Sequence, residues 1–245
     1  VRELSTGLHI HLSQSLRETQ AVEKLWGHTP TAWLAELGLF DHGPVFGAHL
    51  VGLDWDRDPQ ILLEKNFVYA HCPSGGGAGG PSQPYPEALG NNLLTNVAID
   101  THSNDMLENL KLAVLYGQAR EPLLRHISST PLRAPTIADA IAGATTIPAD
   151  ALNRPDLGRI TAGATADLIT VDVSGPLIGI GGRPPEPLHL LLYANGRSVT
   201  NVLINGRFIV RDGRFQPTPD KQIQQAAYPI HQKLWHHLQQ ENWFT

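Results

Sequence analysis

Residues 96–113 read NVAIDTHSNDMLENLKLA, and this stretch decides the fold class. It opens with a short apolar run, Asn96–Asp100, that is typical of a buried strand. Apolar residues then recur at helical spacing over Asp105–Arg120, with acidic residues in the first turn, and Ser103 is the predicted cap. A strand followed at once by a helix is the repeating unit of a parallel α/β sheet.

Three more strand-like runs precede this unit and begin 22 to 38 residues apart, with helical or mixed segments between them. They read GLHIHLS (Gly7–Ser13), VFGAHL (Val45–Leu50) and FVYAH (Phe67–His71). Strands that alternate with helices at this spacing predict a row of parallel βα units over residues 1–155.

The pattern changes after about residue 155, where short strands follow one another closely. Asn205-Gly206 and Asp212-Gly213 are typical turns of antiparallel hairpins. We expect residues 156–215 to form part of a small β-sandwich, and residues 216–245 a terminal helix centred on Asp220–Gln240. The predicted strands are Gly158–Thr161, Ala166–Asp172, Val199–Ile204 and Arg207–Arg211.

The composition excludes several classes of protein. The chain has 245 residues, and its 18 Lys and Arg against 23 Asp and Glu give a net charge of −5, which argues against a nucleic-acid surface. No apolar run approaches the roughly 20 residues that span a bilayer, so we expect no membrane contact. The single cysteine, Cys72, excludes an intrachain disulfide and predicts a reducing, cytoplasmic location.

Each of the four early strands carries an acid/base or ligand group near its carboxyl end: His11, His49, His71 and Asp100. Active sites of parallel α/β folds form at this end of the strands. Imidazole nitrogens with a carboxylate are ligands that suit zinc and similar divalent metals.

In order and spacing, these motifs resemble the amidohydrolase superfamily, in the branch of cytosine deaminase, methylthioadenosine/S-adenosylhomocysteine deaminase and the triazine hydrolases. GLHIHLSQ resembles strand 5 of that family's barrel, and VFGAHLVGLD resembles strand 6. FVYAHCPSGGGAGG resembles strand 7 with its loop, and residues 96–113 resemble strand 8. Residues 157–172 and 199–215 resemble the closing strands of the family's small β-sandwich.

The resemblance implies the C-terminal half of a (β/α)₈ metallo-hydrolase barrel, with part of a small β-sandwich and a C-terminal helix. It implies that His11 and Asp100 bind a divalent metal, zinc or else iron, and that His49, Asp100 and Gln14 occupy the catalytic positions. The reaction implied is attack of metal-activated water on a carbon of a small nitrogen heterocycle, which breaks a C–N or C–halogen bond. A homodimer is the assembly common in that family.

The chain differs from the family pattern in two ways: one residue of the site is substituted, and the first four strands of the barrel are not recognised. Gln14 stands where the family has a glutamate that moves protons, and an amide cannot relay a proton at neutral pH. His9-x-His11 could instead be the family's strand-1 metal pair, but only three more strands follow before residue 150. The expectation is therefore a chain without strands 1–4. The alternative hypothesis is a non-catalytic half-barrel or inactive enzyme that needs a partner to fold.

Several other residues invite a functional interpretation. His71 and His102 are candidate substrate contacts beside the site. Gly75-x-Gly77-x-x-Gly80 matches a dinucleotide fingerprint, but the prolines that follow argue against the helix which that fingerprint needs. Cys72 is expected to be a buried small residue rather than a nucleophile. The histidines near the C-terminus, His231, His236 and His237, are interpreted as surface or docking residues.

Overall fold

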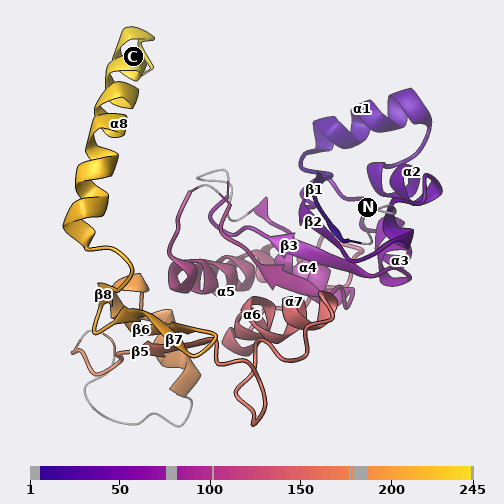
Figure 1. Ribbon diagram of the computed structural model, residues 1–245. Helices are drawn as coiled ribbons and strands as arrows, with labels where there is room; N and C mark the ends of the chain where they lie inside the picture. Colours follow the sequence, from indigo (N-terminus) through magenta and orange to yellow (C-terminus); the bar gives the residue numbers. More distant parts are fainter. Residues whose placement is uncertain (1–5, 76–81, 101, 177, 179–186, 244–245) are drawn as a thin grey trace. The chain divides into compact units, whose positions relative to one another are not determined.

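The computed structural model describes residues 6–75, 82–100, 102–176, 178 and 187–243 (Figure 1). The chain divides into two compact units. The first comprises Val1–Ala164 and Val173–Gly196, and the second comprises Thr165–Asp172 and Arg197–Thr245. None of the described helices is long and apolar enough to cross a membrane.

The first unit is built on a parallel sheet whose described strands run in the order β1-β2-β3-β4. These strands are β1 (Leu8–Leu12), β2 (Val45–His49), β3 (Phe67–His71) and β4 (Thr95–Val97). Leu12 pairs with His49 across the first two strands, so their carboxyl ends lie level. The predicted order of four parallel strands is confirmed.

Helices and 3₁₀ turns connect and flank these strands (Figure 1). The α-helices of this unit are α1 (Leu16–Trp26), α2 (Pro30–Glu36), α3 (Asp58–Leu63), α4 (Tyr85–Gly90), α5 (Met106–Leu124), α6 (Ile137–Ala144) and α7 (Thr146–Ala151). The 3₁₀ turns are η1 (Leu39–Asp41), η3 (Pro187–Leu192) and, at the boundary with the second unit, η4 (Gly196–Ser198).

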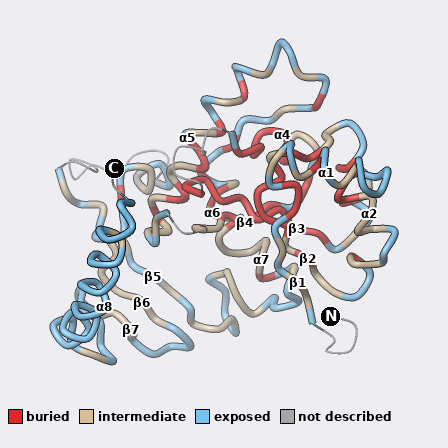
Figure 2. Tube along the Cα trace, turned by 90° about the horizontal axis from the view of Figure 1, so that it is seen from above, coloured by how far each residue is buried: buried red, intermediate tan, exposed pale blue. Residues whose placement is uncertain are grey.

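The core lies against one face of the sheet. Alternate strand residues point to this face and pack against α2, α3 and α4. Figure 2 shows the buried residues gathered in the strands and the nearby helices of this unit. The core cluster consists of Leu12, Phe40, Val45, Leu50, Leu53, Leu62, Phe67, Tyr69, Ala88 and Leu93.

The other sheet face carries the intervening residues and is more open at β1. His9 and His11 are exposed there, and a pocket of about 270 Å³ is lined by His9, Ile10, His11 and Ala48. This is the face on which the predicted metal ligand His11 lies.

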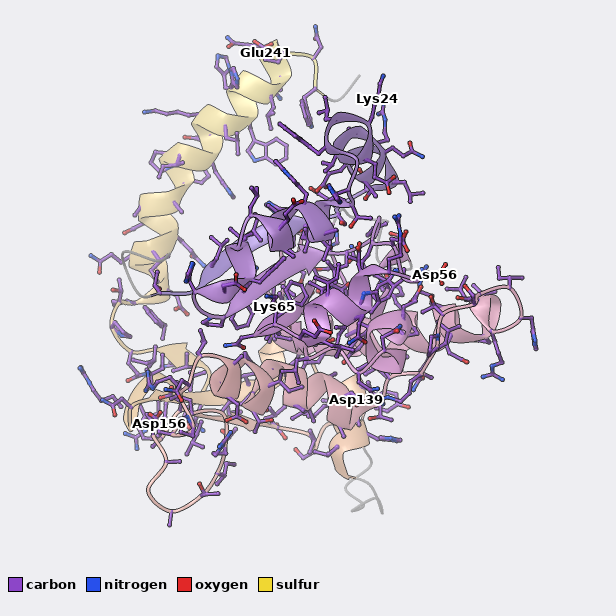
Figure 3. All side chains as sticks on the ribbon, turned by 90° about the vertical axis from the view of Figure 1, so that its right-hand side faces the viewer. Lys24, Asp56, Lys65, Asp139, Asp156 and Glu241 are labelled. Carbon is purple, nitrogen blue, oxygen red and sulfur yellow. The ribbon has the colours of Figure 1, made fainter. Side chains whose placement is uncertain are left out.

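Most charged side chains of the first unit are paired with neighbours at the surface. Lys65 and Asp139, labelled in Figure 3, pair with Asp41 at 2.6 Å and Arg133 at 2.9 Å. Such exposed pairs contribute little stability. Among the described residues, no lysine or arginine forms an ion pair with Asp100.

The second unit contains an antiparallel sheet and a long helix. Its described strands run in the order β5-β6-β7-β8, and their bounds are β5 (Leu168–Val171), β6 (Val199–Ile204), β7 (Arg207–Arg211) and β8 (Arg214–Phe215). Asn205-Gly206 and Asp212-Gly213 take positive φ at both positions, as the predicted hairpin turns require. Helix α8 (Asp220–Gln240) has no buried described residue, and Figure 2 shows it exposed along its length.

The structure corrects two details of the sequence interpretation. Residues 158–161 form no strand, because Gly158 turns the chain at φ +69° and Ile160 is 88% exposed, without the packing that a strand needs. Helix α5 is capped by Asp105, whose carboxylate accepts from the Glu108 backbone N–H, and not by Ser103.

A helix does form within the proline-rich segment, but it begins five residues after the last glycine of the run. Helix α4 begins at Tyr85 with Pro86 in its first turn, where a missing N–H leaves no hydrogen bond unmade. Most of the Gly75–Gly80 fingerprint lies outside the described residues.

Candidate active site

The backbone at the carboxyl ends of three strands takes the left-handed conformation. φ is +46° at Ser13 after β1, +79° at His49 at the end of β2, and +53° at Asp100 after β4. Non-glycine residues adopt this region at an energetic cost, and such residues cluster at functional sites. The residues with this strained backbone conformation therefore lie at the same edge of the sheet as the predicted ligands.

His49, Cys72 and Asp100 come together at this edge. One potential ligand atom from each residue lies within 4.8 Å of the others. His49 and Cys72 are buried and Asp100 is half-buried. Three strands thus bring an imidazole, a thiol and a carboxylate to one point.

His11 adjoins this cluster through its contact with His49. The two rings are stacked, with centroids 5.2 Å apart and planes inclined by only 4°. The parallel pairing of β1 and β2 explains the contact, because Leu12 and His49 are in register at the strand ends. His49 thus adjoins both predicted metal ligands, because His11 stacks on its ring and Asp100 belongs to the same three-residue cluster.

The surroundings set the protonation of two members of the cluster. Burial lowers the pKa of His49 below its usual value, although the nearby Asp100 carboxylate acts in the opposite direction. Burial, with a smaller effect of Asp100, raises the pKa of the Cys72 thiol to about 12. At neutral pH His49 is a neutral base and Cys72 a protonated thiol.

Backbone hydrogen bonds join the loops that follow β1 and β2. The Leu50 N–H donates to the Leu12 carbonyl at 3.2 Å, and the Gly52 N–H donates to the Ser13 carbonyl at 2.7 Å. The Thr19 hydroxyl of helix α1 donates to the Gly52 carbonyl at 2.7 Å. These contacts fix the chain segments that carry His11 and His49 relative to each other.

Gln14 and His102 lie on exposed loops at the same end of the strands. The Gln14 backbone N–H donates to the Glu18 carboxylate at 2.7 Å, and the Ser13 N–H donates to the same carboxylate. Glu18 is therefore occupied with capping the start of helix α1.

His71 does not join the cluster. Its ring lies on the core face of the sheet, 1% exposed, stacked on Tyr85 and within 3.1 Å of the Tyr69 hydroxyl. Residues 69 and 71 of a strand face the same side, and Tyr69 belongs to the core cluster. His71 was expected to contact the substrate, but its side chain is buried on the opposite face of the sheet from His11.

The residue that sequence reasoning missed in the cluster is Cys72. It was expected to be buried, as it is, but not to adjoin His49 and Asp100. The signal was present in the alternation of the strand: position 72 shares the parity of residues 68 and 70, which face away from the Tyr69 side.

Comparison with known proteins gives matches over nearly the whole chain. The family model described as "Amidohydrolase family" matches residues 1–209. The 5-methylthioadenosine/S-adenosylhomocysteine deaminase of Moorella thermoacetica is 33% identical over 225 residues, which are 90% of this chain and 50% of that protein. The chain thus spans about half the length of the curated relatives it matches.

Solved structures share the fold at lower identity. A zinc-bound adenosine deaminase from Xanthomonas campestris superimposes with a TM-score of 0.76 at 24% identity, over 96% of this chain and 52% of that one. Atrazine chlorohydrolase from Arthrobacter aurescens TC1, complexed with zinc, gives a TM-score of 0.75 at 22% identity, over 93% of this chain and 49% of that one.

Proposed function

Since the chain belongs to the amidohydrolase family, we propose that it forms one half of a metal-dependent hydrolase acting on a small nitrogen heterocycle. The bond broken is a C–N bond, or a C–halogen bond. Family membership favours this proposal over a non-catalytic half-barrel. The single observation that carries it is the position of His49 at one sheet edge, where its ring stacks on His11 and its ligand atom clusters with that of Asp100.

The residues present fit a divalent metal ion. Imidazole, carboxylate and thiol are the donor types that zinc prefers, and no lysine or arginine among the described residues forms an ion pair with Asp100. We assign His11 and Asp100 as the metal ligands of this chain. A divalent metal bound there would lower the pKa of a water molecule toward neutrality and supply the nucleophile; zinc is favoured, with iron as the alternative.

The other residues of the site have roles that follow from their protonation and position. His49 is neutral at pH 7, so it can accept a proton or donate a hydrogen bond to the substrate. Asp100 is the second acid–base group of the site, and it can accept a proton and pass it on; its carboxylate lies within 4.8 Å of the His49 ring nitrogen. Gln14 can hold a substrate by hydrogen bonds alone. His102 is a candidate substrate contact, and the buried His71 is assigned no role in the reaction.

The proposal extends to the setting of the enzyme. The substrate is a small molecule, the compartment is the reducing cytoplasm, and the assembly is a homodimer. The lone, protonated Cys72 supports the compartment, since thiols persist where reductants keep them reduced. Because the chain spans about half the length of its curated relatives, we assign the activity to this chain together with the other half of such a barrel, called the extended protein below.

The test is turnover by the zinc-loaded extended protein on a panel of amino- and chloro-substituted heterocycles that includes 5-methylthioadenosine and atrazine. Release of ammonia or chloride is the expected result. We expect His49→Asn and Asp100→Asn to lower kcat by about 10²-fold or more, because positioned acid–base groups contribute about that much. No turnover on any member of the panel would overturn the proposal.

The effect of changing Gln14 distinguishes a substrate that releases ammonia from one that releases a halide. Ammonia must be protonated as it leaves, whereas a halide departs as an anion without a proton. If the substrate carries an amino group, Gln14→Glu restores a proton relay and raises kcat; if it carries a halogen, the same change leaves kcat flat or lowers it. The measurement is kcat against pH for both forms, with Gln20→Glu on the exposed part of helix α1 as a control for added charge.

A further inference from the structure

The loops after β3 and β4 are held together by a buried side chain far along the next helix. We propose that Asn109 of helix α5 is a positioning residue that acts through Ser74 to hold Asp100 in place. This inference rests on the proposed function only in the role it gives to Asp100.

Asn109 uses its whole side-chain amide in this arrangement. The residue is 0% exposed, and its Oδ1 accepts a hydrogen bond of 2.7 Å from the Ser74 hydroxyl. Its Nδ2 donates to the carbonyls of Ser103 at 3.1 Å and Asp105 at 2.8 Å. The partners fix the orientation of the amide, because a flipped group would place its oxygen against two carbonyl oxygens.

Ser74 connects this amide to the backbone next to Asp100. Its hydroxyl, 2% exposed, also lies 3.1 Å from the carbonyl oxygen of Ile99, the residue before Asp100, so its single proton is shared between this carbonyl and Oδ1 of Asn109 in a three-centre hydrogen bond. Asp100 itself has φ +53°, a conformation that the surrounding structure must impose on a non-glycine residue. The Ser74 contact is therefore placed where it can hold the strained turn.

Gly75 shows how closely the two loops meet. A β carbon added at Gly75 would stand 2.6 Å from Oδ2 of Asp100 and 3.1 Å from the carbonyl oxygen of Cys72. The Asp100 carboxylate thus lies directly against the backbone of the loop after β3. Any shift of that loop relative to β4 changes the position of the carboxylate.

Burial of the polar Asn109 side chain costs more free energy than burial of an apolar side chain at the same position would. It shares helix α5 with apolar buried positions such as Leu107, Leu110 and Val114. Burying an amide gains nothing over an apolar side chain unless all its hydrogen bonds are made. Here all of them reach the loops after β3 and β4 or the start of α5, so the amide joins the segments that carry Cys72 and Asp100.

The test uses the thiol of Cys72, the only cysteine in the chain, as a reporter of the two loops. We expect Ser74→Ala and Asn109→Leu each to raise the rate of Cys72 labelling by a disulfide reagent about tenfold under native conditions. The double variant should label no faster than the faster single variant, because both changes remove the same contact. Ser74→Ala removes one oxygen only, which keeps the test valid if Asn109→Leu does not fold.

Thr95→Val is the matched control. Thr95 is buried at the other end of β4, and its hydroxyl donates to the Leu93 carbonyl at 3.2 Å. The change removes a comparable buried hydrogen bond away from the loops, so labelling should stay at the wild-type rate. Equal acceleration in the control, no acceleration in Ser74→Ala, or additive effects in the double variant would each overturn the inference.

Zinc titration of the extended protein separates this inference from the proposed function. Asp100→Asn and Asn109→Leu should both weaken zinc binding, whereas Thr95→Val should not. If Asp100→Asn binds zinc as the wild type does, the proposed function fails. If Asp100→Asn weakens binding but Asn109→Leu and Ser74→Ala do not, only the role of Asn109 fails.

Discussion

His71 shows how one buried side chain can couple folding to pH. The ring is enclosed between Tyr69 and Tyr85, and burial lowers its pKa from 6.5 to about 3. Its Nε2 has no hydrogen-bond partner among the described protein atoms. The folded state therefore holds this imidazole neutral across the range in which the unfolded chain binds a proton.

Stability should fall as the pH falls from 6.5 toward 3, because only the unfolded state gains the His71 proton in that window. With a difference of 1.36 kcal/mol per pKa unit, the loss between pH 6.5 and 4.5 is about 2–3 kcal/mol. The measurement is the free energy of unfolding by urea at several pH values.

His71→Phe is the variant that isolates this effect, since it keeps an aromatic ring and removes the titrating group. The wild type should lose more stability than the variant between pH 6.5 and 4.5, by about the amount stated above. The exposed His231 of helix α8, changed in His231→Phe, serves as the control for replacing an imidazole by a phenyl ring. Parallel curves for wild type and His71→Phe would contradict the prediction.

Single residues also show what the sequence could and could not predict about the site. His11, His49 and Asp100 could be named from the sequence because each lies at or just beyond the carboxyl end of an apolar strand of a parallel sheet. The prediction that His71 contacts the substrate could have been avoided, because side chains alternate along a strand and residue 71 faces the same side as the buried Tyr69. The contact between Ser74 and Asn109 could not be predicted, since it joins a loop to a helix 35 residues away.

At the scale of elements, the close approach of helix α6 to strand β4 depends on Gly143. A β carbon added there would stand 2.8 Å from the Thr95 carbonyl oxygen, which is backbone and cannot move aside freely. We expect Gly143→Ala to destabilise the first unit by about 1–3 kcal/mol through overpacking. Thermal unfolding followed by circular dichroism measures the loss.

The matched glycine is Gly175, where an added β carbon meets no atom within 4 Å and φ is not positive. Gly175→Ala should leave the midpoint unchanged or raise it slightly, because alanine restricts the unfolded chain. An equal drop in both variants would show that crowding against β4 is not the cause.

The elements predicted correctly are those whose ends are set by particular residues in the local sequence. Asn205-Gly206 and Asp212-Gly213 fix hairpin turns through positive φ, and the helix from Asp105 was predicted within four residues of its end. The segment 158–161 had strand-like composition but no partner strand among the described residues. Strand formation depends on pairing and packing, which local composition does not contain.

At the scale of the whole molecule, the parallel order of the four strands could be predicted from their spacing and from the motifs at their ends. The division into two units could be predicted only in part. The sequence placed a boundary near residue 155, whereas the described second unit takes β5 from one stretch and β6 to α8 from another. Which segments join across the intervening Val173–Gly196 depends on tertiary contacts.

The order of strands in the parallel sheet also determines which strand of the site separates first when the sheet opens. β2 and β3 have a neighbour on both sides, whereas the described strands give β1 a single partner, β2. Fewer backbone hydrogen bonds must break to release β1, so its amide protons should exchange with deuterated solvent before those of β2 and β3. His11 lies on β1 and His49 on β2. Opening of the described sheet from the β1 side would therefore displace His11, one of the two proposed metal ligands, and leave the proposed base His49 in place.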